Sequence, residues 1–279
     1  MTSLVNNEHL VVCGTNIESL FMLVQSGIQR VCEWLTVNKL FLNASKTCYM
    51  IISNRFVPTV LNLTINNQVI ERVENHNFLG VLIDAKLTFK KHIDKICGKI
   101  SRGLGIMYRL KHLLNDSVLA NVYYALIHSH LCYGILAWGG AASSNLARLK
   151  SLQRRAVKMC SSYHDSSSLH YRVLSLENLY KYFCCIKIYK SINLDYDPNF
   201  AAHLIGLQPS HSYSTRHREN NNLNVPFFSL TRCHQSVKYN ACRYWNSVPQ
   251  NIKDCDTLQN FKKSYKDFLL FSQPTNIYN

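Results

Sequence analysis

The chain has 279 residues, of which 47% are hydrophobic and 17% are charged. This content is enough for one large domain or two modest domains, each with its own core, and it excludes a disordered tail. The 31 Lys and Arg residues outnumber the 16 Asp and Glu residues, which gives a formal net charge of +15. Such an excess of positive charge favours a polyanionic partner, most often a nucleic acid and sometimes an anionic membrane.

The eleven cysteines form no C-x-x-C pair and show none of the cysteine and histidine spacings that are typical of zinc sites. We interpret them as reduced, mostly buried thiols of an intracellular protein, with nucleus and cytoplasm both left open. The N-terminus lacks a basic start followed by an apolar stretch, so we expect no secretory signal.

Residues 17–35 carry the first strong structural pattern, because apolar residues recur there every three or four positions, as on one face of a helix. These positions are Ile17, Leu20, Phe21, Val24, Ile28, Val31 and Leu35. Short β-rich stretches follow at residues 48–53, 61–66 and 77–84, separated by turn residues. Residues 1–85 are therefore predicted to form a helix packed on antiparallel strands.

Residues 86–205 have an almost wholly helical pattern with a first basic stripe near its start. On a helix that turns about 100° per residue, five cationic residues fall within an arc of about 80°. They are Lys91, Lys95, Lys99, Arg102 and Arg109, and the opposite side is formed by Ile93, Ile96, Ile100, Leu104 and Met107.

A second basic stripe follows in residues 145–160, where cationic and apolar residues again occupy opposite halves of a helix. The cationic half is formed by Arg148, Lys150, Arg154, Arg155 and Lys158, and the apolar half by Leu149, Leu152, Ala156 and Cys160. A charged stripe is most often only a solvated face. The nearly single sign of both stripes instead favours phosphate binding, because solubility needs no such bias.

Between the stripes, residues 117–147 contain no Asp, Glu, Lys or Arg and approach the length of a membrane-spanning helix. Burial of the polar residues at its centre in a bilayer would cost several kcal/mol. These polar residues are Asn121, His128, Ser129 and His130. We therefore predict a helix buried in a protein core, and we expect no membrane partner.

The last quarter of the chain contains a loop and a small helical unit. Residues 206–226 are polar and rich in turn residues, which predicts a surface loop. Residues 227–279 contain a Trp-Asn-x-x-Pro turn, followed by a helix that Asp256 or Thr257 caps. The apolar face of this helix is formed by Leu258, Phe261, Tyr265 and Phe268.

Five stretches in this order resemble the C-terminal half of a jockey-like non-long-terminal-repeat retrotransposon reverse transcriptase. They are WLTVNKLFLNASKTCYMII (34–52), NFLGVLIDAKLTFKKHI (77–93), LIHSHLCYGILAWGG (126–140), LQRRAVKMC (152–160) and YWNSVPQNIKDCDTLQNFKKSYKDFLL (244–270). The resemblance implies an α+β fold: a partial antiparallel palm sheet with a packed helix (1–85), a mainly α-helical thumb-like domain (86–205) and, after the loop, a small C-terminal helical unit.

The resemblance also assigns roles to two residues of the palm. Lys46 lies where the family has a lysine near the incoming nucleotide, although a solvated lysine at a helix end explains it equally well. Gly80 lies in the hairpin that holds the primer end, and a structural glycine in a strand, at a bulge or a close backbone approach, is compatible with that role.

Asn6 and Asn7 stand where the family carries two aspartates that hold catalytic Mg²⁺ ions. Asparagine offers a neutral oxygen without charge, so it would hold a hard divalent cation far more weakly than a carboxylate does. The family's third metal-binding aspartate lies further upstream, and no residue of the chain corresponds to it. The resemblance therefore implies a truncated palm without catalytic residues or metal, and we expect no Mg²⁺ to bind.

Other catalytic arrangements are weaker. The sequence His128-Ser129-His130 and the group around Tyr163, His164 and Asp165 each lack a partner at the spacing that a metal or hydrolase site requires.

These observations favour an inactive reverse transcriptase-like fragment that binds RNA or an RNA–DNA hybrid through its basic helices. Two alternatives stay open: a decayed remnant without function, and a protein-interaction module that self-associates through an exposed sheet edge.

Overall fold

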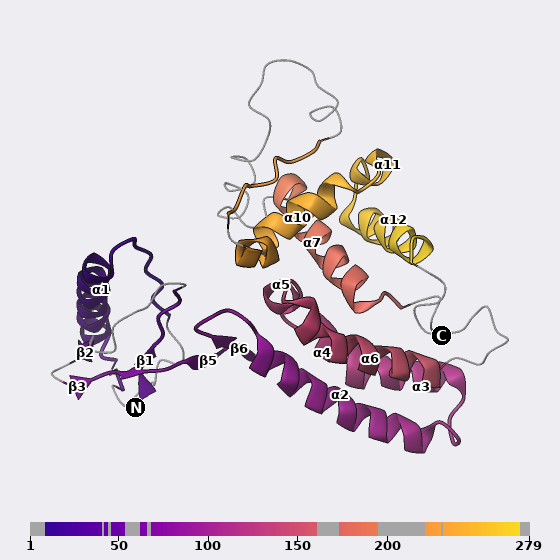
Figure 1. Cartoon of the computed structure of the whole chain (residues 1–279), viewed down its shortest axis with the longest axis horizontal. Helices are drawn as coiled ribbons and strands as arrows, with labels where there is room; N and C mark the ends of the chain where they lie inside the picture. Colours follow the sequence, from indigo (N-terminus) through magenta and orange to yellow (C-terminus); the bar gives the residue numbers. More distant parts are fainter. Residues whose placement is uncertain are drawn as a thin grey trace, which may run out of the picture. The chain divides into compact units, whose positions relative to one another are not determined.

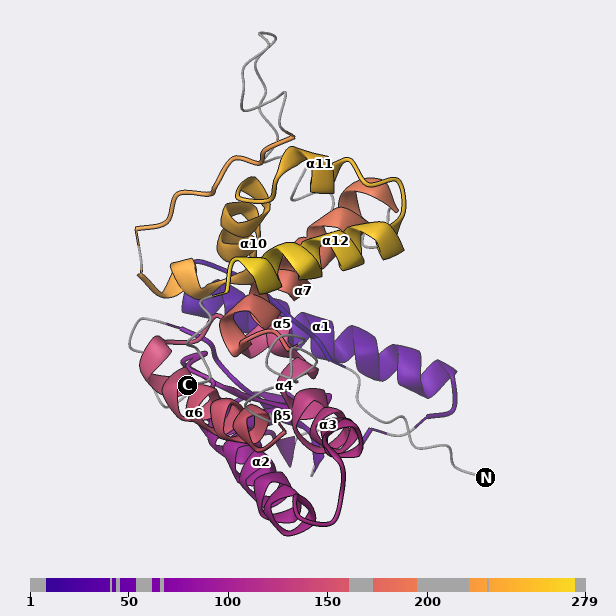
Figure 2. The same ribbon diagram turned by 90° about the vertical axis from the view of Figure 1, so that its right-hand side faces the viewer.

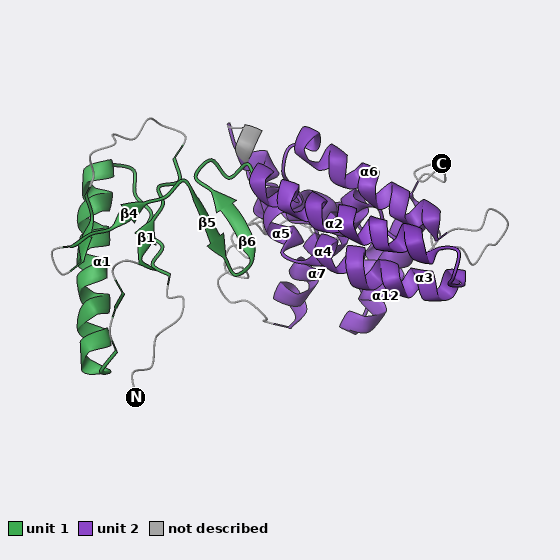
Figure 3. Cartoon of the chain, turned by 90° about the horizontal axis from the view of Figure 1, so that it is seen from below, with its two compact units in different colours: residues 1–88 green, residues 89–279 purple. Residues whose placement is uncertain are grey.

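The computed structural model describes residues 9–40, 42–43, 46–53, 62–65, 68–160, 173–194, 221–229 and 231–273. It contains two compact units, residues 1–88 and residues 89–279 (Figure 1, Figure 3). Asn6 and Asn7, the group around His164, and most of the expected loop at 206–226 lie outside the described residues. The finer division into palm, thumb, loop and C-terminal unit stays a prediction.

The first unit begins with helix α1 (Ile17–Val37), as the apolar spacing predicts. Asn16 caps its start, because the side chain accepts a hydrogen bond of 2.9 Å from the backbone N–H of Glu18. The apolar face of α1 packs on the small core of this unit. That core consists of the buried Leu63, Ile65 and Ile70, with Phe21, Val24, Ile28, Cys32, Leu42 and Tyr49 packed against it.

The described strands of this unit form three separate pairs instead of one antiparallel sheet. Strand β1 (Cys48–Tyr49) pairs in parallel with β4 (Glu71–Arg72). Two antiparallel pairs join β2 (Thr64–Ile65) to β3 (Gln68–Val69) and β5 (Asn75–Phe78) to β6 (Val81–Asp84). Four of these strands have only two residues, which leaves too few backbone groups to extend a ladder to a third strand.

Gly80 lies in the turn of the β5–β6 hairpin and not within a strand. The loop has two residues, Leu79 and Gly80, because Phe78 pairs with Val81. Both have positive φ, 44° and 83°, as in the tight hairpin turns that match the twist of the flanking strands. Glycine adopts this conformation without the steric penalty that a Cβ atom brings.

All regular secondary structure in the described residues of the second unit is helical (Figure 1). Its first half contains α2 (Lys90–Leu110), α3 (Asp116–Tyr123), the π-helical turn η2 (Tyr124–His128), α4 (Ser129–Cys132), α5 (Ile135–Trp138) and α6 (Ser143–Met159). Its second half contains α7 (Leu176–Asn193), the 3₁₀ helix η4 (Thr231–Gln235), α10 (Val237–Asn246), α11 (Gln250–Lys253) and α12 (Leu258–Phe271). The described residues are therefore mostly helical with β structure as a minor part, so the expected α+β fold is confirmed only in part.

The uncharged segment at 117–147 forms most of α3, all of η2, α4 and α5, and the start of α6, in the core of this unit. The backbone turns sharply between α4 and α5, where Gly134 has a φ of 61°. The side chains of this segment that are almost completely buried are Leu119, Tyr123, Ile127, Leu131, Ile135 and Trp138. Among the described residues, no helix has the length and hydropathy needed to cross a bilayer.

The Trp-Asn-x-x-Pro turn holds an upstream segment in place. The buried Trp245 donates its indole N–H to the carbonyl oxygen of Asn221, at 2.8 Å. The side chain of Asn246 accepts from the backbone N–H of Leu223 and donates to its carbonyl oxygen, both at 2.8 Å. Thr257 then caps α12, which packs beside α7 (Figure 2). The motif is thus a clamp within the C-terminal helices.

Replacing Asn246 with alanine is expected to lower the free energy of unfolding by about 2 kcal/mol, because the backbone N–H and carbonyl of the buried Leu223 both lose their partner. Urea unfolding followed by circular dichroism measures this change. Asn251→Ala, at an exposed position of α11, is the matched control and is expected to change stability by less than about 0.5 kcal/mol. Equal effects of both substitutions would contradict the clamp.

Candidate nucleic-acid interface

Helix α2 presents the first basic stripe to solvent. Its apolar side is buried, including all five residues that the sequence placed there. Lys91, Lys95, Arg102 and Arg109 are exposed, and Lys99 is partly buried. Asp94 is the sole acidic residue in the helix. The stripe is therefore accessible and little compensated by acids of its own helix, although its role in binding stays a prediction.

Helix α6 presents the second basic stripe. Arg148, Arg154, Arg155 and Lys158 are exposed, and the helix contains no acidic residue. Lys150 differs from the others, because its ammonium group forms an ion pair with the carboxylate of Glu177 at the start of α7. The positive charge of Lys150 is thus directed toward a partner within the protein.

The packing of the unit relates each stripe to a neighbour of α2. Helices α2 and α6 pack against each other, and Arg148 lies close enough to α2 to oppose the rise in the pKa of Cys97 that burial causes. At the other edge, burial lowers the pKa of His130 on α4, and the positive charges of Lys99 and Arg102 lower it further. The α2 stripe therefore borders α4, whereas Arg148 of the α6 stripe lies near Cys97, on another side of α2.

Small residues occupy the outer surface of α2 between the stripes. On a helical wheel, Gly98, Ser101 and Gly105 fall between the cationic arc of α2 and the side that faces α6. A Cβ atom added at Gly98 or Gly105 would meet no atom of the described residues within 4 Å. Sequence reasoning missed these glycines, although their spacing of seven residues puts both on one side of the helix.

Glycine inside a helix lowers the stability of the helix by about 1 kcal/mol relative to alanine. Close packing within the protein does not explain that cost at Gly98 and Gly105, because the space outside them is open. We use the term basic face for this surface, meaning the two glycines, Ser101 and the exposed cationic residues of both stripes. Those cationic residues are Lys91, Lys95, Arg102, Arg109, Arg148, Arg154, Arg155 and Lys158.

Two further sequence-based candidates lie in the first unit. Lys46 is exposed in a short turn, where its backbone N–H donates to the carbonyl oxygen of Asn43 at 3.1 Å. An exposed lysine fits both a nucleotide contact and a solvated side chain, so the role of Lys46 stays a prediction. The same holds for Gly80, whose position in a tight turn already requires glycine.

The described residues do not gather ligands for a metal ion: no group of three or more His, Cys, Asp or Glu side chains among them is arranged to hold one. The two histidines of the His-Ser-His sequence also have different neighbours. Burial and the positive charge of Lys266 lower the pKa of His128, whereas His130 lies near Lys99 and Arg102. Cationic neighbours disfavour a bound cation at either ring.

The thiols of the second unit are poor nucleophiles where they are buried. Burial raises the pKa of Cys132 to about 11 and that of Cys160 to about 12. A thiol with so high a pKa carries almost no reactive thiolate at neutral pH. These two thiols are therefore poorly suited to nucleophilic chemistry.

Comparison with known proteins gives partial matches to polymerases of mobile elements. Over 143 residues, 49% of the chain, it is 26% identical to "RNA-directed DNA polymerase from mobile element jockey" of Drosophila melanogaster. The jockey polymerase of Drosophila funebris is 24% identical over 210 residues, 70% of the chain. "Probable RNA-directed DNA polymerase from transposon X-element" of Drosophila melanogaster is 25% identical over 156 residues, 53% of the chain.

The matched regions cover 16%, 22% and 17% of these three relatives, so the chain spans about a fifth of their length. No family model matches the chain, and no solved structure matches it. The similarity is thus distant and partial, but it recurs across relatives from more than one element. It relates about half of the chain to the reverse transcriptases of jockey and X-element non-long-terminal-repeat retrotransposons.

Proposed function

We propose that the second unit binds RNA or an RNA–DNA hybrid through the basic face. The observation that carries this proposal is the pair of exposed, nearly acid-free basic stripes on two packed helices, with unfilled glycine positions between them. The relation to RNA-directed DNA polymerases supports the same class of ligand.

The charge of the basic face explains how such a ligand is held. Each phosphate contact made by a lysine or arginine releases condensed counterions, which favours binding at low salt. Arg102 and Arg155 can also contact a phosphate through two parallel hydrogen bonds, because the guanidinium group presents a planar fork of donors. Such contacts position a strand but carry no base information, so this binding is independent of sequence.

The glycines explain why the binding surface lies on α2. Without a Cβ atom at positions 98 and 105, a sugar-phosphate backbone approaches the helix backbone more closely than a larger side chain allows. The cationic residues of the two stripes then border the bound strand on both sides. The protein of this proposal binds nucleic acid and does not extend it, because the resemblance puts Asn6 and Asn7 where the polymerase family carries paired aspartates.

The first prediction from this proposal concerns the salt dependence of binding. Changing Lys91 and Lys95 to glutamine is expected to reduce the slope of log affinity against log salt by roughly 0.7 to 0.9 per phosphate contact that is lost. Affinity is expected to fall about equally for RNA and hybrid ligands of any sequence. Fluorescence anisotropy with labelled oligonucleotides at several salt concentrations measures both quantities.

The control for this prediction changes Lys262 and Lys263 to glutamine, which removes the same net charge from α12, outside the basic face. The control is expected to retain most of the salt slope. Equal slopes for the two double variants would show that the α2 stripe is only a solvated face. Binding that is insensitive to salt, together with self-association, would instead favour a protein-interaction module.

The second prediction concerns the glycines of the basic face. Gly98→Ala combined with Gly105→Ala is expected to raise the free energy of unfolding by about 1 to 2 kcal/mol, because alanine favours the helix at open positions.

Leucine at the same two positions is expected to weaken binding of an RNA–DNA hybrid, because the side chains occupy the space of the bound strand. Ser101→Ala adds no bulk and is the matched control. Unchanged affinity of a folded leucine variant would contradict a role in binding.

The third prediction concerns catalysis. The purified chain is expected to show no template-dependent primer extension with either Mg²⁺ or Mn²⁺, because amide oxygens replace two metal-binding carboxylates at Asn6 and Asn7. Incorporation of labelled nucleotides into a primer on an RNA template measures this activity. An active reverse transcriptase serves as the positive control. Extension that survives removal of contaminating polymerases would overturn the proposal of an inactive protein.

A further inference from the structure

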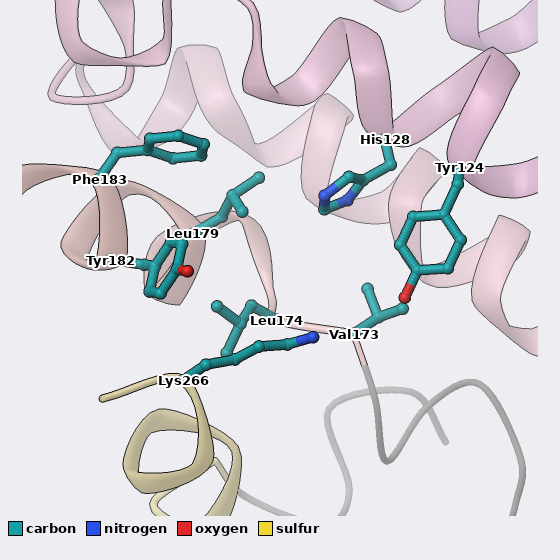
Figure 4. Close-up of a pocket in the computed structure, with 8 residues that line it drawn as sticks. All are labelled: Tyr124, His128, Val173, Leu174, Leu179, Tyr182, Phe183 and Lys266. Atoms are coloured by element: carbon teal, nitrogen blue, oxygen red, sulfur yellow. The ribbon is translucent and has the colours of Figure 1, made fainter. Parts of the chain in front are cut away.

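The second unit contains a cavity that is separate from the basic face. Its volume is about 170 Å³, and it lies among η2, the segment before α7, α7 itself and α12. Figure 4 shows its lining residues, which are Tyr124, His128, Val173, Leu174, Leu179, Tyr182, Phe183 and Lys266. An apolar cavity of about 150 Å³ is large enough to hold benzene. The space therefore accommodates one six-membered ring with small substituents.

The cavity has an apolar floor and an aromatic rim. Val173, Leu174 and Leu179 are at most 3% exposed and form the floor. Gln153 fixes this floor, because its buried amide donates to the carbonyl oxygen of Leu174 at 2.9 Å and accepts from the N–H of Leu176 at 2.8 Å.

At the rim, Tyr124 is 37% exposed, and Tyr182 and Phe183 are partly buried. Rings at the mouth of an apolar space favour a flat ligand that packs against their faces.

The π-helical turn brings a polar pair to this cavity. Tyr124 and His128, four residues apart in this turn, lie side by side with ring centroids 5.1 Å apart. Single π-helical turns occur often at functional sites. The Nδ1 atom of His128 is buried and has no hydrogen-bond partner among the described residues. Such an atom is costly unless a ligand or water satisfies it.

Lys266 supplies a cation at the same place. Its side chain reaches from α12 toward Val173, and the His128 ring and the Tyr124 hydroxyl point toward the same space (Figure 4). Burial, and to a lesser extent the charge of Lys266, lowers the pKa of His128, which favours the neutral imidazole. A neutral imidazole has one nitrogen that donates a hydrogen bond and one that accepts it.

We propose that this cavity binds one pyrimidine nucleotide, with the base against the aromatic rim, His128 Nδ1 on the edge of the base, and the Lys266 ammonium on the phosphate. A single pyrimidine ring fits the volume. The base edge offers carbonyl acceptors and, in uracil, an N–H donor, so it satisfies either tautomer of His128. The phosphate matches the charge of Lys266.

The pyrimidine nucleotide is either free or an unpaired unit of a bound strand, since both offer the same ring and phosphate. The strand form deepens the proposed function, because a base splayed out of a single strand stacks on aromatic side chains. Binding of a free nucleotide does not depend on the basic face.

Calorimetric titration of the full chain with uridine 5′-monophosphate, adenosine 5′-monophosphate, ribose 5-phosphate and uridine tests the proposal. The uridine nucleotide is expected to bind at least about tenfold more tightly than each of the other three, which lack a fitting base or the phosphate. Lys266→Met is expected to weaken its binding about tenfold and to remove the preference over uridine. Lys263→Met, an exposed lysine of the same helix, is the matched control and is expected to retain both.

The strand form is tested with oligouridylate and oligoadenylate. The wild-type chain is expected to prefer oligouridylate, and His128→Phe, which keeps a ring but loses the polar edge, is expected to lose this preference. Equal affinity for the uridine nucleotide and ribose 5-phosphate, or equal effects of Lys263→Met and Lys266→Met, would overturn the proposal. The variant with Lys91 and Lys95 changed to glutamine is expected to bind the free nucleotide unchanged, so failure of the basic face and failure of the cavity are distinguishable.

Discussion

Burial of the apolar side of α2 is the constraint on which the arrangement of the second unit depends. Ile93, Ile100 and Met107 are at most 1% exposed, and full burial of each such side chain contributes about 1.5 to 3 kcal/mol. This burial fixes the rotation of the helix about its axis. A quarter turn would expose these residues and bury cationic ones, at a far larger cost. The exposure of the basic stripe therefore follows from the packing on the opposite side of the same helix.

A second set of constraints is polar, and it connects parts of the chain that lie far apart in sequence. Gln153 of α6 binds the backbone at the start of α7 through Leu174 and Leu176. Asn246 binds the backbone of Leu223 in the same two-sided way. A side-chain amide can satisfy an N–H and a carbonyl together, so it replaces secondary structure where the chain is irregular. The floor of the cavity and the C-terminal helices both depend on such amides.

Helix α1, helix α2, helix α6 and the Thr257 cap follow from local patterns, because apolar periodicity and side-chain capping act within a few residues. The expected antiparallel sheet was confirmed only as small pairs, one of them parallel, because strand pairing depends on contacts between distant segments. At the candidate site, the ion pair of Lys150 likewise depends on a contact that local sequence does not predict. The sequence places it on a basic stripe, but its partner Glu177 comes from the next long helix.

The sequence by itself determined the excess of positive charge, the helical stripes, the asparagine pair at Asn6 and Asn7, and the resemblance to retrotransposon polymerases, because each is a property of composition, period or order. Only the tertiary structure decided that the helices of the two stripes pack against each other and that Gly98 and Gly105 on α2 are open. It alone brought His128, Leu179 and Lys266 to one cavity. These three residues lie on η2, α7 and α12, and their proximity results from the packing of helices whose apolar faces are buried together, which no local pattern encodes.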